Sequence, residues 1–331
     1  MTMILRFLSR SVLVCTLLLF LHSTYCSAND NITYRLKWLR NVSVVGALYA
    51  EHNQLFSKAG LNVTVKPGGP ERDAIRELEL GRADFGVASA DQVLRARAKG
   101  APIVVIAQLF QINPLQWIYR PEKLQLGSLA DLKEKVIGVT FGGNDESIMR
   151  TLLAEGNLDS SQVRLFSVRY DYTPFYRKRV QLWPVYRNAQ GPIITAQLAQ
   201  EGEKTAYFNP ADFGVKFVAN SVVTHVRTLK EKPELVQRFL GVLLSGWQQA
   251  LDPENEKAVL SLLQHYEPNI PQTIQQEQLR ITRTLIQPDP TVAIGRIDHA
   301  GWDQTQEIMV SQKLLPHTFA LQEILKPQKS L

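Results

Sequence analysis

The chain has 331 residues, of which 45% are apolar, so it is long enough to form two domains or one large domain with a sizeable core. Its formal net charge is +6, and the basic residues are dispersed without interleaved aromatic residues, a pattern that gives no support to nucleic-acid binding. The densest basic cluster, at 177–179, is typical of a solvated turn, with an anion contact as the alternative.

Residues 1–28 have the pattern of a cleaved secretory signal peptide. Arg6 and Arg10 flank the start of an apolar run at 11–21, and small residues up to Ala28 fit a cleavage site. The alternatives are an uncleaved anchor, for which the run is shorter than the roughly 20 residues that span a bilayer, and lipidation at Cys26.

Both cysteines, Cys15 and Cys26, lie in this leader. Cleavage after Ala28 would therefore leave a mature chain without cysteine, disulfide or thiolate metal site. The loss of Arg6 and Arg10 would also lower the net charge from +6 to +4.

From residue 32 the sequence alternates short apolar strands with amphipathic helices, which is typical of an α/β fold. In the first part we expect strands at 32–38, 61–66, 103–110 and 117–120, and helices at 47–59 and 71–80.

The stretch from Gly81 to Gly100 combines a buried strand, a turn and a capped helix. Ser89 stands at the expected N-cap, and Gln92 follows at the spacing of a capping box. A strand that ends directly in a helix N-terminus directs backbone N–H groups and positive dipole charge into a crevice. We therefore expect ligand contacts at Ser89 and Asp91, although plain capping residues would look the same.

The pattern then restarts, with a helix at 129–135, a strand at 136–140 and a helix from the Phe141-Gly-Gly-Asn144 turn to Glu155. Asn144 is the expected N-cap. Further strands are expected at 163–168, 181–186 and 217–226, and helices at 173–178, 193–200, 234–251, 254–266, 271–285 and 300–312. Trp247 and Trp302 are interpreted as packing residues of the last helices.

Several segments resemble the NMT1/THI5-like family of thiamine-precursor binding proteins, over essentially the whole mature chain. The most specific are Leu36-Lys-Trp38, Lys66-Pro-Gly-Gly-Pro70, 83–92, Ala96-Arg-Ala-Lys-Gly100, Tyr170-Asp-Tyr-Thr-Pro174, Trp183-Pro-Val-Tyr186, Pro210-Ala-Asp-Phe-Gly214 and the tail at 287–302.

This resemblance implies a two-lobed periplasmic-binding-protein type II fold in which the chain crosses between the lobes twice. Lobe 1 would comprise 29–116 with 222–331, and lobe 2 would comprise 117–221. It further implies a periplasmic, monomeric protein that delivers a thiamine pyrimidine precursor, such as formylaminopyrimidine, to an ABC permease in the inner membrane.

The same superfamily contains pyrimidine-precursor synthases, which use a pyridoxal-phosphate lysine, a nearby histidine and a Cys-rich iron motif. Here the two positions read Ala88 and Gln92, and the mature chain has no cysteine. A Schiff base needs a lysine amine, and none stands near this segment, so we interpret the chain as a binding protein without catalytic residues or a cofactor.

The predicted ligand site combines flat aromatic faces with amides and carboxylates that direct hydrogen bonds. Trp38 is the expected stacking platform, and Tyr186 supplies the opposing face. Gly142, Gly143 and Asn144 offer bare backbone N–H groups across the cleft. The further polar candidates are Gln111, Asn113, Asp171, Asn188 and Gln190.

Two positions depart from many relatives. Val44 replaces a histidine after the first tryptophan, and Gln190 replaces an acidic residue after Tyr186. An amide is a weaker partner for an aminopyrimidine than a carboxylate, so riboflavin-like heterocycles, or a sulfonate at the helix N-termini, stay open as ligands. The six histidines show no ligand spacing, and we assign no metal.

Overall fold

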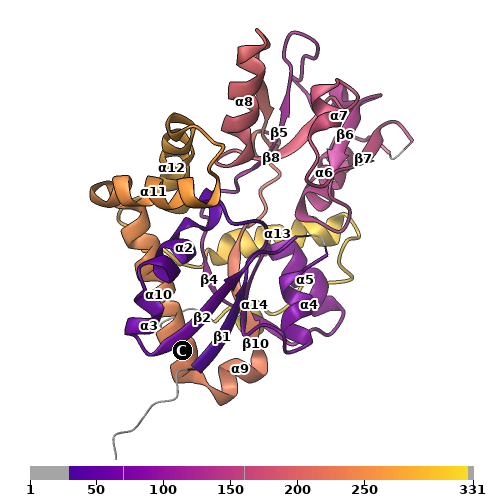
Figure 1. Cartoon of the computed structure of the whole chain (residues 1–331). Coiled ribbons are helices and arrows are strands. Elements are labelled where there is room, and N and C mark those ends of the chain that lie inside the picture. The colour runs from indigo at the N-terminus through magenta and orange to yellow at the C-terminus, as the bar shows by residue number, and fades with distance from the viewer. Residues whose placement is uncertain (1–29, 70, 160, 327–331) are drawn as a thin grey trace, which may run out of the picture. The chain divides into compact units, whose positions relative to one another are not determined.

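The computed structural model describes residues 30–69, 71–159 and 161–326, and the predicted signal peptide at 1–28 lies outside the described residues. We call the part built on a five-stranded sheet the first lobe (Figure 1). Its strand order is β2-β1-β3-β10-β4. The strands are β1 (Asp30–Arg35), β2 (Leu61–Lys66), β3 (Phe85–Ala88), β4 (Ile103–Gln108) and β10 (Ser221–His225).

The direction of β10 sets the topology of this sheet. β1 and β3 run parallel, with Tyr34 opposite Phe85, whereas β10 is antiparallel to both β3 and β4. Because β10 lies between two strands that precede it by more than a hundred residues, the chain leaves the sheet after β4 and returns to it late.

Helices cover this sheet and extend from it. The first group is η1 (Val42–Val44), α2 (Val45–His52), α3 (Leu55–Lys58), α4 (Ala74–Glu79) and α5 (Ala90–Ala98). The C-terminal group is α9 (Val226–Glu231), α10 (Pro233–Leu251), η4 (Pro253–Asn255), α11 (Glu256–Tyr266), α12 (Gln272–Ile286), α13 (His299–Ser311) and α14 (Leu321–Ile324).

The core of the first lobe is organised around Phe239 of α10. Its ring stacks on Phe85 of β3 at 3.8 Å between centroids and on Phe56 of α3 at 5.6 Å, and it meets Tyr34 edge-on. Trp247 and Trp302 are 1% and 0% exposed, which confirms them as packing residues.

The second lobe, defined here as the elements from β5 to β9, carries two smaller sheets. One has the antiparallel order β8-β5-β9, and the other pairs β6 with β7 in parallel. Its elements are β5 (Leu115–Tyr119), η2 (Leu129–Leu132), β6 (Val136–Val139), α6 (Asn144–Glu155), β7 (Arg164–Ser167), α7 (Thr173–Tyr176), β8 (Trp183–Tyr186), α8 (Gln190–Gln200) and β9 (Ala206–Phe208), followed by η3 (Pro210–Phe213).

Most predicted elements are confirmed in kind, and their differences have local causes. The helix expected over 47–59 is broken at Gln54, whose φ of 59° is left-handed. The segment 129–135 forms only a short 3-10 helix, and the strand expected over 217–226 is limited to β10. Asn144 was the wrong N-cap: Gly143 caps α6, and Asn144 is its first helical residue.

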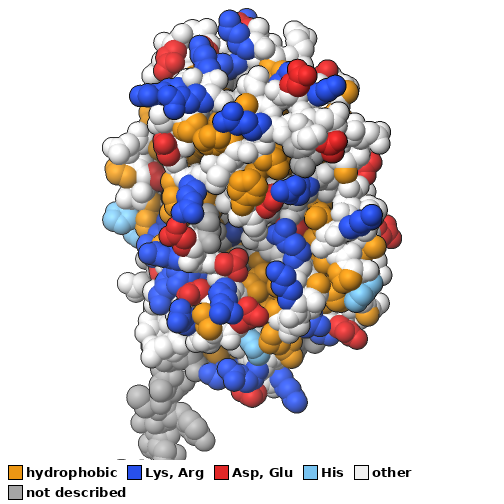
Figure 2. All heavy atoms as spheres, turned by 90° about the vertical axis from the view of Figure 1, so that its right-hand side faces the viewer, with side chains coloured by type: hydrophobic (Ala, Val, Ile, Leu, Met, Phe, Trp, Pro, Cys, Tyr) orange, Lys and Arg blue, Asp and Glu red, His pale blue; other side chains and the backbone are white. Residues whose placement is uncertain are grey.

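The two crossings lie between β4 and β5 and between β9 and β10. The predicted lobe boundaries at 116 and 221 stay a prediction. Within the described part of the chain, no helix is both long and apolar enough to span a membrane. Figure 2 shows one face of the molecule, on which Lys and Arg side chains are spread among Asp, Glu and hydrophobic side chains.

A close contact between α2 and α10 generates the first prediction. A Cβ added at Gly46 would lie 2.2 Å from Trp247 Cγ and 2.6 Å from its Cα, and neither atom can move without displacing α10. We expect Gly46→Ala to lower the free energy of unfolding by about 1–3 kcal/mol in urea denaturation, as overpacking does.

The control for this prediction is Gly241→Ala on α10 itself. A Cβ at Gly241 meets nothing within 4 Å, so helix propensity alone should act and stability should stay level or rise by about 0.5–1 kcal/mol. Equal stability of the two variants would contradict the packing account.

Candidate functional site

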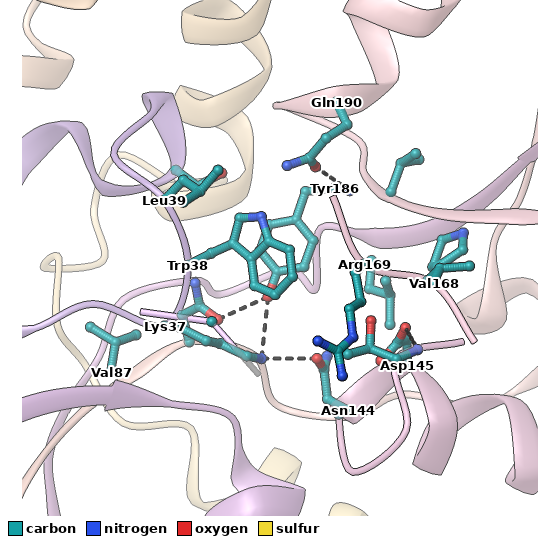
Figure 3. A pocket seen from close by; sticks show the side chains of 18 of the residues that line it. Lys37, Trp38, Leu39, Val87, Asn144, Asp145, Val168, Arg169, Tyr186 and Gln190 are labelled. Carbon is teal, nitrogen blue, oxygen red and sulfur yellow. Dashed lines mark hydrogen bonds between the residues drawn. The ribbon is translucent and has the colours of Figure 1, made fainter. Parts of the chain in front are cut away.

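A cavity of about 330 Å³ lies between the two lobes. The first lobe lines it with the segment that follows β1, with Gln92 of α5 and with Asn220 before β10. The second lobe lines it with the turn that precedes α6, with β8 and with Gln190 of α8 (Figure 3). Three loop segments, two helix starts and one strand therefore converge on one space.

The segment after β1 is fixed by backbone hydrogen bonds to the end of β2. Leu36 N donates to Lys66 O at 2.8 Å, and Gly68 N donates to Trp38 O at 2.9 Å. Leu36 is buried, whereas Lys37 lines the cavity. Trp38 lines the cavity as predicted, and its ring contacts the ring of Tyr170 at 4.9 Å between centroids.

Lys37 joins the lobes across the cavity. Its Nζ donates to Asn144 Oδ1 at 2.9 Å and to Tyr186 OH at 3.3 Å (Figure 3). Among the described residues Lys37 has no ion-pair partner, so two neutral oxygens hold its charge. No lysine stands near Ala88 in the sequence, but the fold brings the amine of Lys37 to the cavity from the segment after β1, so the prediction of a cavity without a lysine amine is corrected.

The Phe141–Asn144 turn is held by its own polar groups. Gly142 has a φ of +82°, and its N–H donates to Glu146 Oε2 at 2.7 Å. Gly143 N donates to Thr140 O at 2.7 Å. The backbone N–H groups that were expected to be bare at these two glycines are thus already used, although both residues line the cavity.

Asp145 is the buried carboxylate of the cavity wall. It is 5% exposed, and its Oδ2 accepts from Thr140 N at 2.6 Å. Burial raises the pKa of Asp145 to about 6, while the hydrogen bonds from Thr140 and the charge of Lys37 oppose the rise.

Tyr186 lies at the centre of the opposite wall. Its OH accepts from Lys37 and donates to Asn220 Oδ1 at 3.0 Å, while its backbone N donates to Gln190 Oε1 at 3.1 Å. Gln190 lines the cavity as predicted. One tyrosine therefore orients three polar side chains.

The capped helix start of α5 is confirmed, but Ser89 and Asp91 do not line the cavity. They are 1% and 0% exposed, and Ser89 Oγ donates to Asp91 Oδ1 at 2.6 Å. The N–H of Ala90 donates to Val218 O, which belongs to the segment that leads into β10, so this N–H at the start of α5 is already used. Gln92, which was predicted as the capping-box partner of Ser89 and not as a ligand contact, lines the cavity.

Four other predicted residues are held elsewhere. Asn113 lies outside the cavity lining, where its Nδ2 donates to Phe217 O at 3.0 Å. The Gln111 amide donates to Gln108 O and Arg296 O, and Asp171 Oδ1 accepts from Thr173 N in an exposed turn. Asn188 is fully buried, where its Nδ2 donates to Thr282 Oγ1 at 2.9 Å. The structure brings together Trp38, Gly142, Gly143, Asn144, Tyr186 and Gln190, and it leaves Ser89, Asp91, Gln111, Asp171 and Asn188 outside the cavity lining.

Sequence reasoning missed further residues of the wall. They are Lys37, Asn41, Asp145, Arg169, Tyr172 and Asn220. Lys37 directly precedes Trp38, and Asp145 directly follows Asn144. Their position next to predicted site residues was therefore the sequence signal that could have identified them. For Asn220 no signal existed, because the return of β10 places it. Asn41 is the N-cap of η1, three residues after Trp38. In the described part, no three His, Cys, Asp or Glu side chains gather as a metal site.

Comparison with known proteins agrees with this geometry. Residues 41–256 match the family described as NMT1/THI5 like. The chain is 23% identical to the formylaminopyrimidine-binding protein of Halalkalibacterium halodurans over 84% of each chain. It is 27% identical to a putative thiamine biosynthesis protein of Haemophilus influenzae, over 89% of this chain and 91% of that protein.

A solved structure shares the fold. The alkanesulfonate-binding protein SsuA from Xanthomonas axonopodis pv. citri, bound to MOPS, superposes with a TM-score of 0.68 at 18% identity, over 91% of this chain and 98% of that chain. The α/β fold is thus the two-lobed periplasmic-binding-protein type II fold with two crossings, as expected.

The raised pKa of Asp145 generates a pH prediction. The pKa of Asp145 in the folded protein, about 6, lies above its ordinary value of 3.8. Above pH 6 the buried carboxylate is ionised and lowers the free energy of unfolding. As pH falls through 6 the carboxylate takes up a proton, and this loss of stability disappears. Between about pH 7.5 and pH 5 the wild type should gain about 1 kcal/mol of unfolding free energy relative to Asp145→Asn.

Urea denaturation of both proteins at the two pH values measures this difference. Comparison with the variant cancels the other carboxylates, several of which have lowered pKa values and act with the opposite sign. An unchanged difference between the two proteins would show that Asp145 does not titrate as a buried group.

Proposed function

Because the chain belongs to the NMT1/THI5-like family, we propose that it is an extracytoplasmic solute-binding protein that captures a small flat heterocycle for an ABC permease in the inner membrane. The observation that carries this proposal is the cavity between the lobes, with Trp38 on one side and Tyr186 on the other. The name of the Halalkalibacterium halodurans relative supports a thiamine pyrimidine precursor, formylaminopyrimidine, as the first ligand to test.

The cavity wall suits a flat ring with a few polar atoms. Aromatic side chains from both lobes, Trp38, Tyr172, Trp183 and Tyr186, offer apolar area, and amide side chains offer directed hydrogen bonds. Its volume of about 330 Å³ lies at the lower end of ordinary ligand pockets, which favours a single small ring system.

Contacts that cross the cavity support capture by closure of the lobes. Besides Lys37, Arg95 of α5 donates to Gly142 O at 3.1 Å, and Arg169 of the second lobe pairs with Glu71 of the first. A ligand between the lobes would add contacts that exist only in the closed state, and such differential affinity is what shifts a hinge equilibrium.

The location and partners follow the same proposal. The predicted signal peptide would direct the protein to the periplasm, where it would act as a monomer and dock on its permease after closure. No cofactor or catalytic role is proposed, because Lys37 is engaged by Asn144 and Tyr186.

A thermal-shift screen of the purified protein, refolded from denaturant to remove carried ligand, tests the proposal. The panel comprises formylaminopyrimidine, hydroxymethylpyrimidine, thiamine, riboflavin, taurine and an alkanesulfonate. A ligand at about 100 times its dissociation constant should add about 2.7 kcal/mol of stability. A response to a heterocycle supports the proposal, and a response to sulfonates alone would replace it with a sulfonate-binding function.

Removal of the Trp38 ring tests the stacking platform. If the ring stacks on the ligand, Trp38→Ala should lower affinity by about 1–3 kcal/mol in calorimetric titration with the responding heterocycle. Leu80→Ala is the control, since Leu80 is 43% exposed and lies outside the cavity lining. Equal affinities of Trp38→Ala and wild type would place the ring in a structural role against Tyr170.

A further inference from the structure

Five side-chain amides line the cavity, and all five have the same hydrogen-bond pattern. In each, the carbonyl oxygen accepts a hydrogen bond from the protein, while the NH₂ group has no hydrogen-bond partner in the described part of the chain. The five residues are Asn41, Gln92, Asn144, Gln190 and Asn220.

Backbone N–H groups hold three of these oxygens. Ser43 N donates to Asn41 Oδ1 at 2.9 Å, Ser89 N to Gln92 Oε1 at 3.2 Å, and Tyr186 N to Gln190 Oε1 at 3.1 Å. A backbone N–H cannot accept a hydrogen bond, so rotating any of these amides by 180° would set two donors against each other. Their orientation is therefore determined by the chain.

Lys37 determines the other two. Its ammonium has only donors, so Asn144 must present Oδ1 to it. The same ammonium donates to Tyr186 OH, and the phenol proton is donated to Asn220 Oδ1, because a rotated Asn220 would leave that proton without an acceptor. In Figure 3 the nitrogen of Gln190 points to the side of the view where Trp38 and Leu39 lie.

Asn144 shows most clearly that a partner is missing. The residue is 6% exposed, and its Nδ2 is buried without a hydrogen-bond partner. Buried amide donors are nearly always paired in native proteins, so an orphan donor in a cavity wall indicates an acceptor that the ligand brings.

Acceptors in the same wall are fewer than these donors, and each of its two carboxylates accepts a backbone N–H on only one of its two oxygens. Of the two carboxylates that line it, Asp73 accepts from Arg76 N at 2.9 Å and Asp145 accepts from Thr140 N. Lys37 and Arg169 add donors. Donors therefore outnumber free acceptors around the cavity.

We propose that the cleft selects heterocycles by their acceptor atoms, with ring nitrogens and carbonyl oxygens facing the five amides. An exocyclic amino group would set donor against donor, so it is the disfavoured substituent. This inference rests on the proposed function of heterocycle capture, and it replaces the aminopyrimidine named there with oxo-substituted flat heterocycles as the ligand class of the same cavity.

A matched pair of ligands tests the inference. Calorimetric titration would compare 4-amino-5-hydroxymethyl-2-methylpyrimidine with the compound that carries an oxo group in place of the 4-amino group. The two have nearly the same size and shape, so donor and acceptor chemistry decides between them. We expect the oxo compound to bind about tenfold tighter or more, because each mismatch leaves a buried polar group unpaired.

Gln190→Glu tests the assignment of the amides. The carboxylate can still accept from Tyr186 N, but it replaces the free NH₂ with an acceptor, so the preference for the oxo compound should fall about tenfold or reverse. Gln197→Glu is the control, because it makes the same change at an exposed site on the same helix, outside the cavity lining, and should keep the wild-type preference.

Tighter binding of the amino compound by wild type would overturn the inference and leave the proposed function intact. An unchanged preference in Gln190→Glu would also overturn it. Absence of binding by both compounds and by riboflavin, a larger oxo heterocycle, would overturn the inference together with the proposed function.

Discussion

The pairing of β10 with both β3 and β4 is the constraint on which the binding cleft depends. β10 follows the whole second lobe in sequence, yet it inserts antiparallel between two strands that precede that lobe. The chain must therefore cross between the lobes twice. Because Asn220 stands directly before β10, the same pairing brings it to the cavity formed by the end of β1 and the start of α5.

Within the cleft, two residues organise the polar groups. Lys37 extends from the first lobe and donates to Asn144 and Tyr186. The hydroxyl of Tyr186 in turn donates to Asn220, and its backbone N–H donates to Gln190. In each of these amides the oxygen is engaged by the protein, and the nitrogen has no hydrogen-bond partner among the described residues. The contacts that join the lobes thus also set which hydrogen bonds a ligand must complete.

The sequence predicted local structure well and its spatial consequences less well. The strand, Ser89 cap and helix of 81–100 lie where hydrophobic periodicity and capping chemistry placed them, since these depend on neighbours in sequence. The predicted ligand contact at Ser89 is different, because it depends on a distant segment: the backbone oxygen of Val218 accepts from the N–H of Ala90 at this helix start. Asn188 likewise lies close to predicted Tyr186 in sequence but packs against Ser43 and Thr282, which only the fold brings near. Trp38 and Gln190 line the cavity as expected, whereas the position of Lys37 depends on the hydrogen bonds between the segment after β1 and the end of β2.

A crystal structure of the protein with the heterocycle that stabilises it most would test the account most directly. The account predicts a ring in contact with Trp38 in the cavity between the lobes, with ring nitrogens or carbonyl oxygens within about 3.2 Å of the amide nitrogens of Gln190 and Asn220. A ligand bound outside this cavity, or one whose amino groups face these amides, would contradict it.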